Sequence, residues 1–501
     1  MDIILKSLAL ITDPSTLGVM LLAAVFGLFV GAIPGLTATM ATALLIPFTF
    51  FMDPVPAIAA IVATVATAIF AGDIPGALLR IPGTPASAAY CDETYAMTKK
   101  GLAERALGIA LVTSVIGGLA GSIILSMSAP ALAEFAIQFS SYEYFWLACL
   151  GLSCAVIIST GSTLKGFVSL FIGLFIATIG IDGTAGHPRF TFGSVELLAG
   201  VSFIPAMIGM FAISEVLRYV ASTRTVIEVP QQSVGSVFKG LGSTLYRYKI
   251  NIFRGSSIGA VVGILPGAGA DIAAWICYAI SKKRSKEPEK FGTGHPEGLV
   301  DAGSANNASL AGAWVPAIVF GIPGDSITAI VIGVLYMKGM NPGPMVFIER
   351  PELIYSVFIA FFIANLALLP LGFGAIKLSR QILKIPRKVL MPIILVFCMV
   401  GAFAINNTVF GITVMLVLGI IAYVMEENGF PVAPAILGIV LGNMIEDNFM
   451  ASMIKADGDP LGFFSRPIAA TLGVVTIVLW LTPLLLLFIR HIKSRSIKRT
   501  L

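Results

Sequence analysis

Charged residues are scarce in this chain of 501 residues. Asp, Glu, Lys and Arg make up 12% of it, whereas 57% is hydrophobic and the mean hydropathy is +0.94. A water-soluble protein normally carries about 25% charged residues. This composition therefore excludes a soluble globule and requires a lipid bilayer.

Residues typical of enzyme chemistry or disulfide bonding are also few. The five cysteines lack paired spacing and mostly lie in apolar segments, so we interpret them as packing residues. Three histidines lie far apart, and the sequence contains neither an HExxH metal motif nor a GxxxxGKS/T phosphate loop. These absences argue against ATP hydrolysis by this chain. An intramembrane enzyme remains an alternative, but no cluster of acidic or nucleophilic residues supports it.

Apolar stretches long enough to cross a bilayer are numerous. About 20 apolar residues span the hydrocarbon core, and we predict an all-α polytopic protein with ten to twelve crossings. Examples are residues 106–127, 144–160, 353–376, 408–424 and 468–489. The 51 glycines and 28 prolines are many for a simple anchor, and broken backbone is tolerated in a membrane only where protein buries it or where it lines a cavity. This favours a transporter.

Three motifs recur in the same order in the two halves of the sequence. GAIPGL at 31–36 is echoed by GILPGA at 263–268, and PAMIG at 205–209 by PAILG at 434–438. Between them, an IPG begins at Ile81 and again at Ile322, with a tyrosine fourteen residues later in both cases. This order predicts an internal duplication.

Matching loops of the two halves differ in charge. Residues 51–56 and 128–143 contain no Lys or Arg, whereas the matching stretches 282–290 and 377–388 carry five basic residues each. Since Lys and Arg concentrate in cytoplasmic loops, matching loops face opposite sides. The two halves are therefore predicted to be inverted repeats, which place a binding site near the membrane midplane.

The remaining basic segments complete this topology. The bias reverses for 99–105, which is basic, against 338–352, where acidic residues offset the basic ones. We divide the chain into a first membrane repeat, a basic cytoplasmic linker, a second membrane repeat, and a final transmembrane helix with a basic cytoplasmic tail, which are residues 1–217, 218–254, 255–467 and 468–501. These basic loops account for the net charge of +5 without nucleic-acid binding. Glu426 and Glu427 dissent, because they fall on the predicted cytoplasmic side.

Four Pro-Gly turns are the candidate binding elements. Both ends of 255–281 are predicted to be cytoplasmic, yet this stretch is too short for two crossings. A re-entrant hairpin that turns at Pro266-Gly267 resolves this, and Pro34-Gly35 mirrors it. Such turns expose free N–H groups that suit carboxylates, although each turn can also be a plain proline kink. The residues predicted to bind substrate are Pro34, Gly35, Thr37, Arg80, Pro82, Gly83, Thr84, Pro266, Gly267, Gly269, Pro323 and Gly324.

Polar residues near these turns are the candidate ion ligands. Asn306 and Asn307 have no polar equivalents in the first half, and Asp325 follows Pro323-Gly324. With Asp271 they offer the oxygen ligands that hard cations prefer, while hydrogen bonding between helices remains the alternative for the asparagines. Arg80 suits bidentate carboxylate binding, or it pairs structurally with Asp73.

A set of longer motifs resembles a known family. The motifs are GAIPGLTATMATALLIP from 31, IPGTPASAAYCDETYAMTKKG from 81, GILPGAGADIAAW from 263, GHPEG and ANNA within 294–308, and GIPGDSITA from 321. Together they resemble the large membrane subunit of the tripartite tricarboxylate transporters (TctA-type) over nearly the whole chain. The resemblance implies import of carboxylates driven by a sodium or proton gradient, with no other cofactor. It also implies two partners, a small four-span membrane subunit and a periplasmic solute-binding protein, and a location in the bacterial inner membrane.

Two departures from the family pattern fall near the predicted site. FAGDIPGALLR at 70–80 introduces Asp73 and Arg80, and the acidic residue before the asparagines is Asp301, further back than usual. These departures leave the fold unchanged but leave the substrate and the coupling ion open. A stand-alone ion-coupled organic-anion transporter without a binding protein remains the alternative. In either case we expect an elevator-like or rocking motion around the midplane site.

Overall fold

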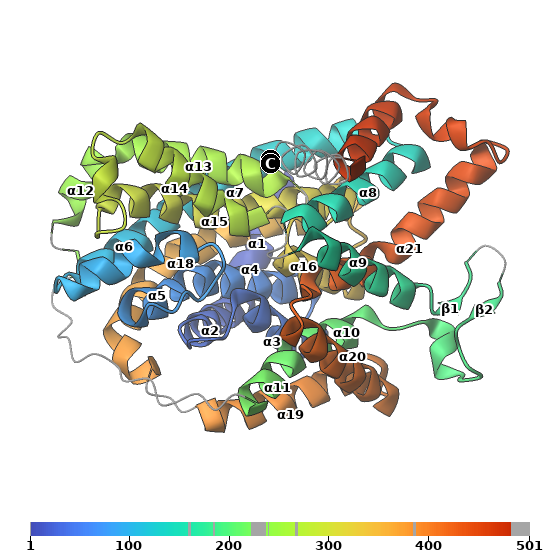
Figure 1. Ribbon diagram of the computed structural model, residues 1–501, viewed down its shortest axis with the longest axis horizontal. Coiled ribbons are helices and arrows are strands. Elements are labelled where there is room, and N and C mark those ends of the chain that lie inside the picture. The colour runs from blue at the N-terminus through green and yellow to red at the C-terminus, as the bar shows by residue number, and fades with distance from the viewer. Residues whose placement is uncertain are drawn as a thin grey trace, which may run out of the picture.

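The computed structural model describes residues 2–158, 162–183, 186–221, 237–238, 240–265, 269–383 and 387–481. These residues form helices almost throughout, with one short two-stranded antiparallel sheet (Figure 1). Helix dominates because a chain in lipid must satisfy its backbone hydrogen bonds internally. The prediction of an all-α polytopic membrane protein is confirmed.

The first half contains eleven α-helices within the described residues, together with a π-helical turn, a 3-10 turn and the two strands. They are α1 (Asp2–Thr12), α2 (Pro14–Gly31), α3 (Ala38–Phe50), α4 (Pro54–Ala71), α5 (Asp73–Leu79), α6 (Ala88–Lys99), α7 (Ala103–Ala136), α8 (Ser141–Ile158), α9 (Thr163–Ala177), β1 (Gly180–Ile181), β2 (Pro188–Arg189), η1 (Glu196–Ala199), α10 (Phe203–Ile208), the π-helix η2 (Gly209–Ile213) and α11 (Ser214–Ala221).

The linker and the second half follow the same pattern of short and long helices. Their elements are α12 (Leu241–Arg247), α13 (Lys249–Ile264), α14 (Gly269–Arg284), η3 (Pro288–Lys290), α15 (Pro296–Phe320), α16 (Ser326–Met337), α17 (Val346–Glu349), α18 (Pro351–Leu383), α19 (Arg387–Asn406), α20 (Val409–Glu427), α21 (Val432–Lys455), η4 (Pro460–Phe464) and a last apolar helix, Pro467–Leu481.

Seven helices in the described part of the chain are long and apolar enough to cross a membrane, and five shorter apolar helices accompany them. Large apolar side chains point outward on several of these helices, for example Leu22, Met127 and Phe171, each more than 60% exposed. Lipid accounts for such exposure. By contrast, α13 and α14 have 16 residues each, or about 24 Å of rise. This length suits the predicted re-entrant hairpin.

Equivalent glycines make equivalent contacts in the two halves. Gly31 begins the GAIPGL motif in α2, and a Cβ placed there would lie 2.6 Å from the Ala68 carbonyl oxygen of α4. Gly263 begins GILPGA in α13, and its Cβ would lie 2.2 Å from the Ser309 carbonyl oxygen of α15. Ala68 and Ser309 both stand thirteen residues before the first residue of an IPG. The same backbone-to-backbone packing therefore occurs twice, as the predicted duplication requires.

A second pair of contacts extends the duplication and crosses between the halves. Gly438 of α21 lies in the PAILG motif and packs against Gly173 of α9 in the first half. Gly209 lies in the matching PAMIG motif, begins η2, and packs against Gly419 of α20 in the second half. Helices from the end of each half therefore pack against helices from the end of the other half.

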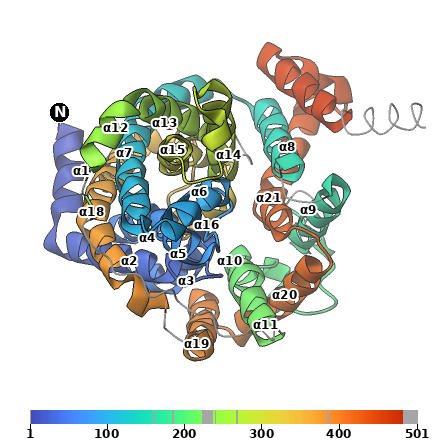
Figure 2. The same cartoon turned by 60° about the vertical axis from the view of Figure 1, so that its left-hand side comes forward.

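The helices lie in two groups (Figure 2). The larger group contains α1–α7, α12–α16 and α18, and the smaller group contains α8–α11 and α19–α21. Two helices that follow Pro-Gly turns bridge the groups, because Pro47 of α3 contacts Gly401 of α19 and Gly333 of α16 contacts Phe203 of α10. The helices that follow the turns at Pro34-Gly35 and Pro323-Gly324 therefore lie at the boundary between the two groups.

Loops that the charge pattern assigns to the outer side contact one another. The Lys338 ammonium donates hydrogen bonds to the carbonyl oxygens of Phe50, at 2.9 Å, and Met52. Arg189 of β2 forms an ion pair with Glu446 of α21.

Segments that the charge pattern assigns to the cytoplasmic side also contact one another. The Lys100 ammonium donates to the Thr293 carbonyl oxygen at 2.6 Å, which brings 99–105 against the segment after 282–290. Arg218 at the start of the linker forms an ion pair with Glu426. This pair offsets the negative charge of Glu426, the residue that dissents from the predicted cytoplasmic assignment.

Candidate functional site

Two of the Pro-Gly turns are described in full at the start of a helix. Gly35 has φ 87°, a left-handed conformation that glycine adopts without strain, and the Thr37 hydroxyl accepts a hydrogen bond from the Met40 N–H to cap α3. Pro323 and Gly324 are buried before α16. The N-termini of α3 and α16 therefore carry the positive helix ends that the sequence predicts.

The other two turns differ in how much is described. Pro266 and Gly267 lie outside the described residues, as does the side chain of Asp271. Gly83 follows the exposed Pro82 and lies against the end of α4, where its N–H donates to the Gly72 carbonyl oxygen at 3.1 Å. Thr84 bonds with Ser87 in a local turn. This turn is thus packed against backbone rather than open.

A chain of contacts connects elements of all four turns. The hydroxyls of Thr39 and Ser326 lie 3.2 Å apart, which joins α3 to α16. A Cβ on Gly269 would lie 2.7 Å from the Asp325 side chain, so the start of α14 touches the start of α16. Further along α14, the Trp275 indole N–H donates to the Pro85 carbonyl oxygen at 3.1 Å. Turns that are distant in sequence are therefore neighbours.

Asn306 completes a buried polar chain between the two halves. Its amide donates to the Tyr90 hydroxyl at 3.0 Å, and that hydroxyl donates to the Asp73 carboxylate at 2.7 Å. All three side chains are at most 3% exposed. A carboxylate buried this deeply with one hydrogen bond is suited to hold a proton or a cation.

Asn307 lies on the neighbouring face of α15 and leaves one oxygen free. Its amide N–H groups donate to the Ser114 carbonyl oxygen at 3.1 Å and to the Asn365 side-chain oxygen at 2.9 Å. Its own side-chain oxygen is buried without a partner among the described residues, and so is the Ser114 hydroxyl. Buried polar atoms are normally satisfied. The two oxygens, on α15 and α7, are therefore candidate ligands for a small cation.

The Asp325 carboxylate is already engaged as the cap of α16. One of its oxygens accepts from the Thr328 N–H at 2.7 Å and from the Thr328 hydroxyl at 2.6 Å, while the Asp325 N–H donates back to that hydroxyl. This is a reciprocal capping box. A structural role therefore accounts for Asp325 without an ion.

Arg80 points away from the buried chain. It ends α5 with φ 58°, and its guanidinium forms an exposed ion pair with Asp92 at 2.8 Å. The alternative that Arg80 pairs with Asp73 is wrong, because the left-handed turn directs Arg80 toward α6 while Tyr90 occupies Asp73. Its substrate-binding role stays a prediction.

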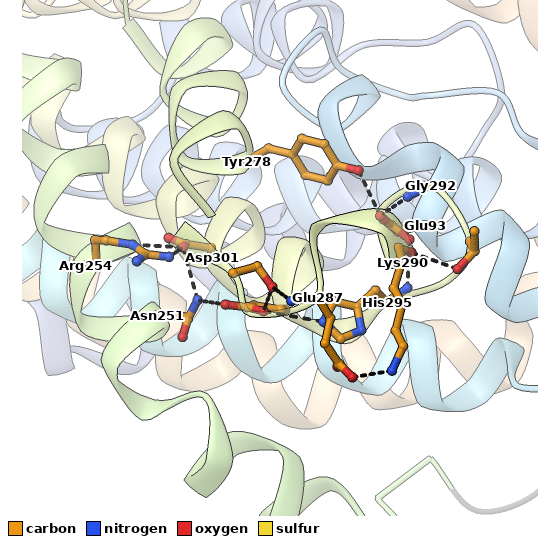
Figure 3. A network of polar contacts seen from close by, with 12 residues as sticks. Glu93, Asn251, Arg254, Tyr278, Glu287, Lys290, Gly292, His295 and Asp301 are labelled. Atoms are coloured by element: carbon orange, nitrogen blue, oxygen red, sulfur yellow. Dashed lines mark hydrogen bonds and ion pairs between the residues drawn. The ribbon is translucent and has the colours of Figure 1, made fainter. Parts of the chain in front are cut away.

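Glu93 of α6 holds the loop that leads into α15 (Figure 3). Its fully buried carboxylate accepts hydrogen bonds from the Tyr278 hydroxyl at 2.8 Å and from the backbone N–H groups of Gly292, Gly294 and His295. Four donors satisfy a buried charge of the first half with groups of the second. We call this arrangement the Glu93 clasp.

Asp301, which departs from the family spacing, attaches α13 of the predicted hairpin to α15. It is fully buried on α15 and forms an ion pair with Arg254 of α13, and Asn251 donates to the same oxygen at 3.4 Å (Figure 3). Breaking a buried pair leaves an uncompensated charge. This departure is therefore explained by the attachment of α13 to α15.

The geometry above is that of broken helices meeting between two related halves, and the family comparison agrees with it. The model of the tripartite tricarboxylate transporter TctA family matches residues 17–437. The chain belongs to the tripartite tricarboxylate transporter TctA family. Members of this family are transporter components, so the protein is a component of a transport system and a multi-pass membrane protein.

Two proteins from Agrobacterium vitis are similar in sequence to this TctA-family chain. An uncharacterized 52.8 kDa protein in the TAR-I ttuC' 3' region is 34% identical over 460 residues, 91% of either chain. An uncharacterized protein in the TAR-II ttuC' 3' region is 36% identical over 228 residues, 45% of this chain and 94% of the relative. No solved structure matches the chain. Neither relative's name states a substrate.

Several residues of the site escaped the sequence reasoning. Tyr90 and Glu93 lie within the quoted IPGTPASAAYCDETYAMTKKG motif, but they were not singled out, and neither were Ser114 and Asn365. A usable signal was the low hydropathy of residues 88–99, where an acidic helix is expensive in a membrane protein unless it is bonded. Ser114 offered none, since lone serines are common in membrane helices.

Proposed function

We propose that this chain is the permease subunit of a binding-protein-dependent secondary transporter whose import of di- or tricarboxylates is driven by a sodium or proton gradient. The observation that carries the proposal is the chain of contacts joining the Pro-Gly turns of two related halves in a TctA-family protein. A small four-span membrane subunit and a periplasmic solute-binding protein would complete the system. The alternative is a permease that works without a binding protein.

The Pro-Gly turns would hold the carboxylate. The helices α3, α14 and α16 each begin directly after one of these turns, so the N–H groups of their first turns that Thr37 and Asp325 do not already cap are directed toward the turns. Thr39 and Ser326 add hydroxyl donors where α3 meets α16. A di- or tricarboxylate would replace its hydration shell with these donors. Of the predicted substrate-binding set, Pro34-Gly35 and Pro323-Gly324 lie directly before α3 and α16, whereas Pro82 is exposed and Gly83 is bonded to the Gly72 backbone.

The coupling ion would bind beside the turns, and the two candidate ions favour different residues. Sodium prefers several neutral or anionic oxygens, as at the free oxygens of Asn307 and Ser114. A proton needs a titratable group, which the buried chain of Asp73, Tyr90 and Asn306 supplies. The identity of the ion therefore decides which variants fail.

The first experiment measures uptake of labelled citrate, succinate and acetate into vesicles. The chain is tested alone, and together with the products of the genes that neighbour it, under imposed sodium or pH gradients. Uptake of a multivalent carboxylate that needs both the gradient and the neighbours supports the proposal. Gradient-driven uptake by the chain alone supports the alternative, and gradient-independent uptake contradicts both.

A second experiment tests the ion site with a matched control on α7. For sodium coupling, we expect Asn307→Ala and Ser114→Ala to raise the half-saturating sodium concentration about tenfold, a loss of about 1.4 kcal/mol. Ser122→Ala is the control, because the Ser122 hydroxyl is already bonded to the Gly118 carbonyl oxygen on the same helix. For proton coupling, Asp73→Asn and Asn306→Ala would instead impair uptake driven by a pH gradient. Unchanged ion dependence in all four site variants would remove these residues from coupling.

A further inference from the structure

A cavity of about 450 Å³ lies where three basic segments of the chain meet. Its lining comes from the end of α6, the start of α7, α12 with Tyr248 after it, and residues within 287–296. Arg105, Arg247 and Lys290 contribute positive charge, and Ser243, Thr244 and Tyr248 contribute hydroxyl groups. Cavities that bind small molecules commonly have this volume. This basic cavity is separate from the Pro-Gly turns.

Neither arginine of the lining forms an ion pair with a carboxylate of the described residues. The Arg105 guanidinium donates one hydrogen bond to the Thr244 hydroxyl at 3.0 Å, and its Nε is buried without a partner in the part of the chain that the structure describes. Arg247 lies over the Tyr248 ring at 5.5 Å, and no ion pair links it to a described carboxylate. Both therefore retain donors for an incoming anion.

The third cation of the lining, Lys290, is paired with the acidic residue of the lining, Glu287. Lys290 forms an exposed ion pair with Glu287. The pKa of the Glu287 carboxyl lies below its ordinary value, chiefly because Lys290 donates a hydrogen bond to it and also because the charges of Lys290 and Arg247 stabilise its ionised form. The lining itself thus carries three cations and one carboxylate, while the Glu93 and Glu297 carboxylates contact His295 in its wall.

The wall of the basic cavity is held in place before any ligand arrives. Gly294 and His295 line the cavity, and their backbone N–H groups donate to Glu93 in the Glu93 clasp (Figure 3). A fixed wall lowers the cost of ordering the site on binding. The lining consists of helix ends and loops rather than an exposed apolar face, which favours a soluble anion over a lipid.

We propose that the basic cavity binds a soluble carboxylate that carries two or more negative charges. Its lining segments are the basic ones that the charge pattern assigns to the cytoplasm, so the ligand is taken from the cytoplasmic side. The proposal rests on the proposed function only in choosing a carboxylate as the ligand. Arg105 and Arg247 supply the charged donors, and the three hydroxyls orient the ligand.

The test is equilibrium binding to the purified full-length protein in neutral-lipid nanodiscs, with no gradient. Citrate and succinate are titrated calorimetrically into wild type, Arg247→Gln, and the double variant Arg105→Gln/Arg247→Gln. A charge-assisted hydrogen bond contributes about 1.5–3 kcal/mol, so we expect each lost arginine to weaken citrate binding by about tenfold or more. Acetate should bind at least tenfold more weakly than citrate.

The control is Lys249→Gln, which removes a nearby positive charge that does not line the cavity. It should bind citrate like wild type, and the melting temperatures of all variants show whether they are folded. Absence of citrate and succinate binding to wild type overturns the proposal. So does equal binding in the double variant, or occupancy by phosphatidylglycerol in place of either carboxylate. Because no transport is measured, failure here leaves the uptake experiments to judge the proposed function.

Discussion

Whether a buried side-chain oxygen has a hydrogen-bond partner distinguishes the candidate ion ligands better than their residue type does. Asn307 and Asp325 were chosen for the same reason, as polar residues beside broken helices. In the structure, the Asp325 carboxylate is occupied by its cap, whereas the Asn307 oxygen has no described partner. Unsatisfied buried acceptors are expensive, so the Asn307 oxygen is the stronger indication of a ligand.

The variant Asp325→Asn keeps a side chain that can cap α16 but removes the negative charge. Asn caps helices about as well as Asp, whereas Ala costs about 1 kcal/mol. We therefore expect Asp325→Asn to unfold near the wild-type temperature and Asp325→Ala to unfold at a lower one, as measured by thermal denaturation in detergent. Equal destabilisation of both variants would argue against the cap. Sodium- or proton-driven uptake by the Asn variant then shows whether the charge also binds the coupling ion.

The sequence could identify Asn306 and Asn307 because amides are unusual in an apolar helix. It could not identify their partners, since Tyr90 and Ser114 come from other helices and are ordinary in isolation. Arg80 shows the same limit. Its left-handed φ turns it toward Asp92, and this depends on backbone geometry that no spacing reveals.

At the scale of elements, the Glu93 clasp joins the two halves, and close glycine contacts join helices both within and between the halves. Both place a group of one element directly against the backbone of another. Such contacts are sensitive to changes of one atom, because neither a backbone carbonyl nor a row of N–H groups can rearrange cheaply.

Glu93→Gln tests the clasp. The amide would direct an N–H group at backbone donors and remove a charge that four donors satisfy. We expect a loss of about 1–3 kcal/mol in stability, seen as a lower melting temperature. The neighbouring Asp92→Asn is the control, since its ion pair with Arg80 is more than 60% exposed on both sides and contributes little. If both variants melted alike, the clasp would not be a stabilising contact.

Gly31→Ala tests the repeated helix contact. The added Cβ would meet the Ala68 carbonyl oxygen at 2.6 Å, which forces α2 and α4 apart at a cost of about 1–3 kcal/mol. Gly18→Ala on the same helix is the matched control, because nothing lies within 4 Å of its Cβ. Thermal denaturation should show a lower melting temperature for Gly31→Ala only. Unaltered stability of Gly31→Ala would mean that the helices separate without cost.

At the scale of the whole molecule, the duplication was readable but the grouping of the helices was not. Three short motifs indicated two related halves, and the contacts of Gly31 and Gly263 repeat accordingly. The exchange of α8–α11 and α19–α21 into one group depends on packing between distant segments, such as Gly173 against Gly438. The predicted elevator-like or rocking motion would act at the boundary that α3 and α16 form with this group.

The predicted inversion of the halves is decided by which side of the membrane matching loops face. Phe51 and Lys282 are exposed residues of matching loops, and a cysteine at either position should react with a membrane-impermeant maleimide. In a variant that lacks the five natural cysteines, Phe51→Cys should be labelled in intact spheroplasts, and Lys282→Cys only after the cells are opened. Lys99→Cys is a second cytoplasmic position, exposed at the end of α6. Labelling of Phe51→Cys and Lys282→Cys from one side would mean parallel halves, and the Pro-Gly turns of such halves would not face one another across the midplane.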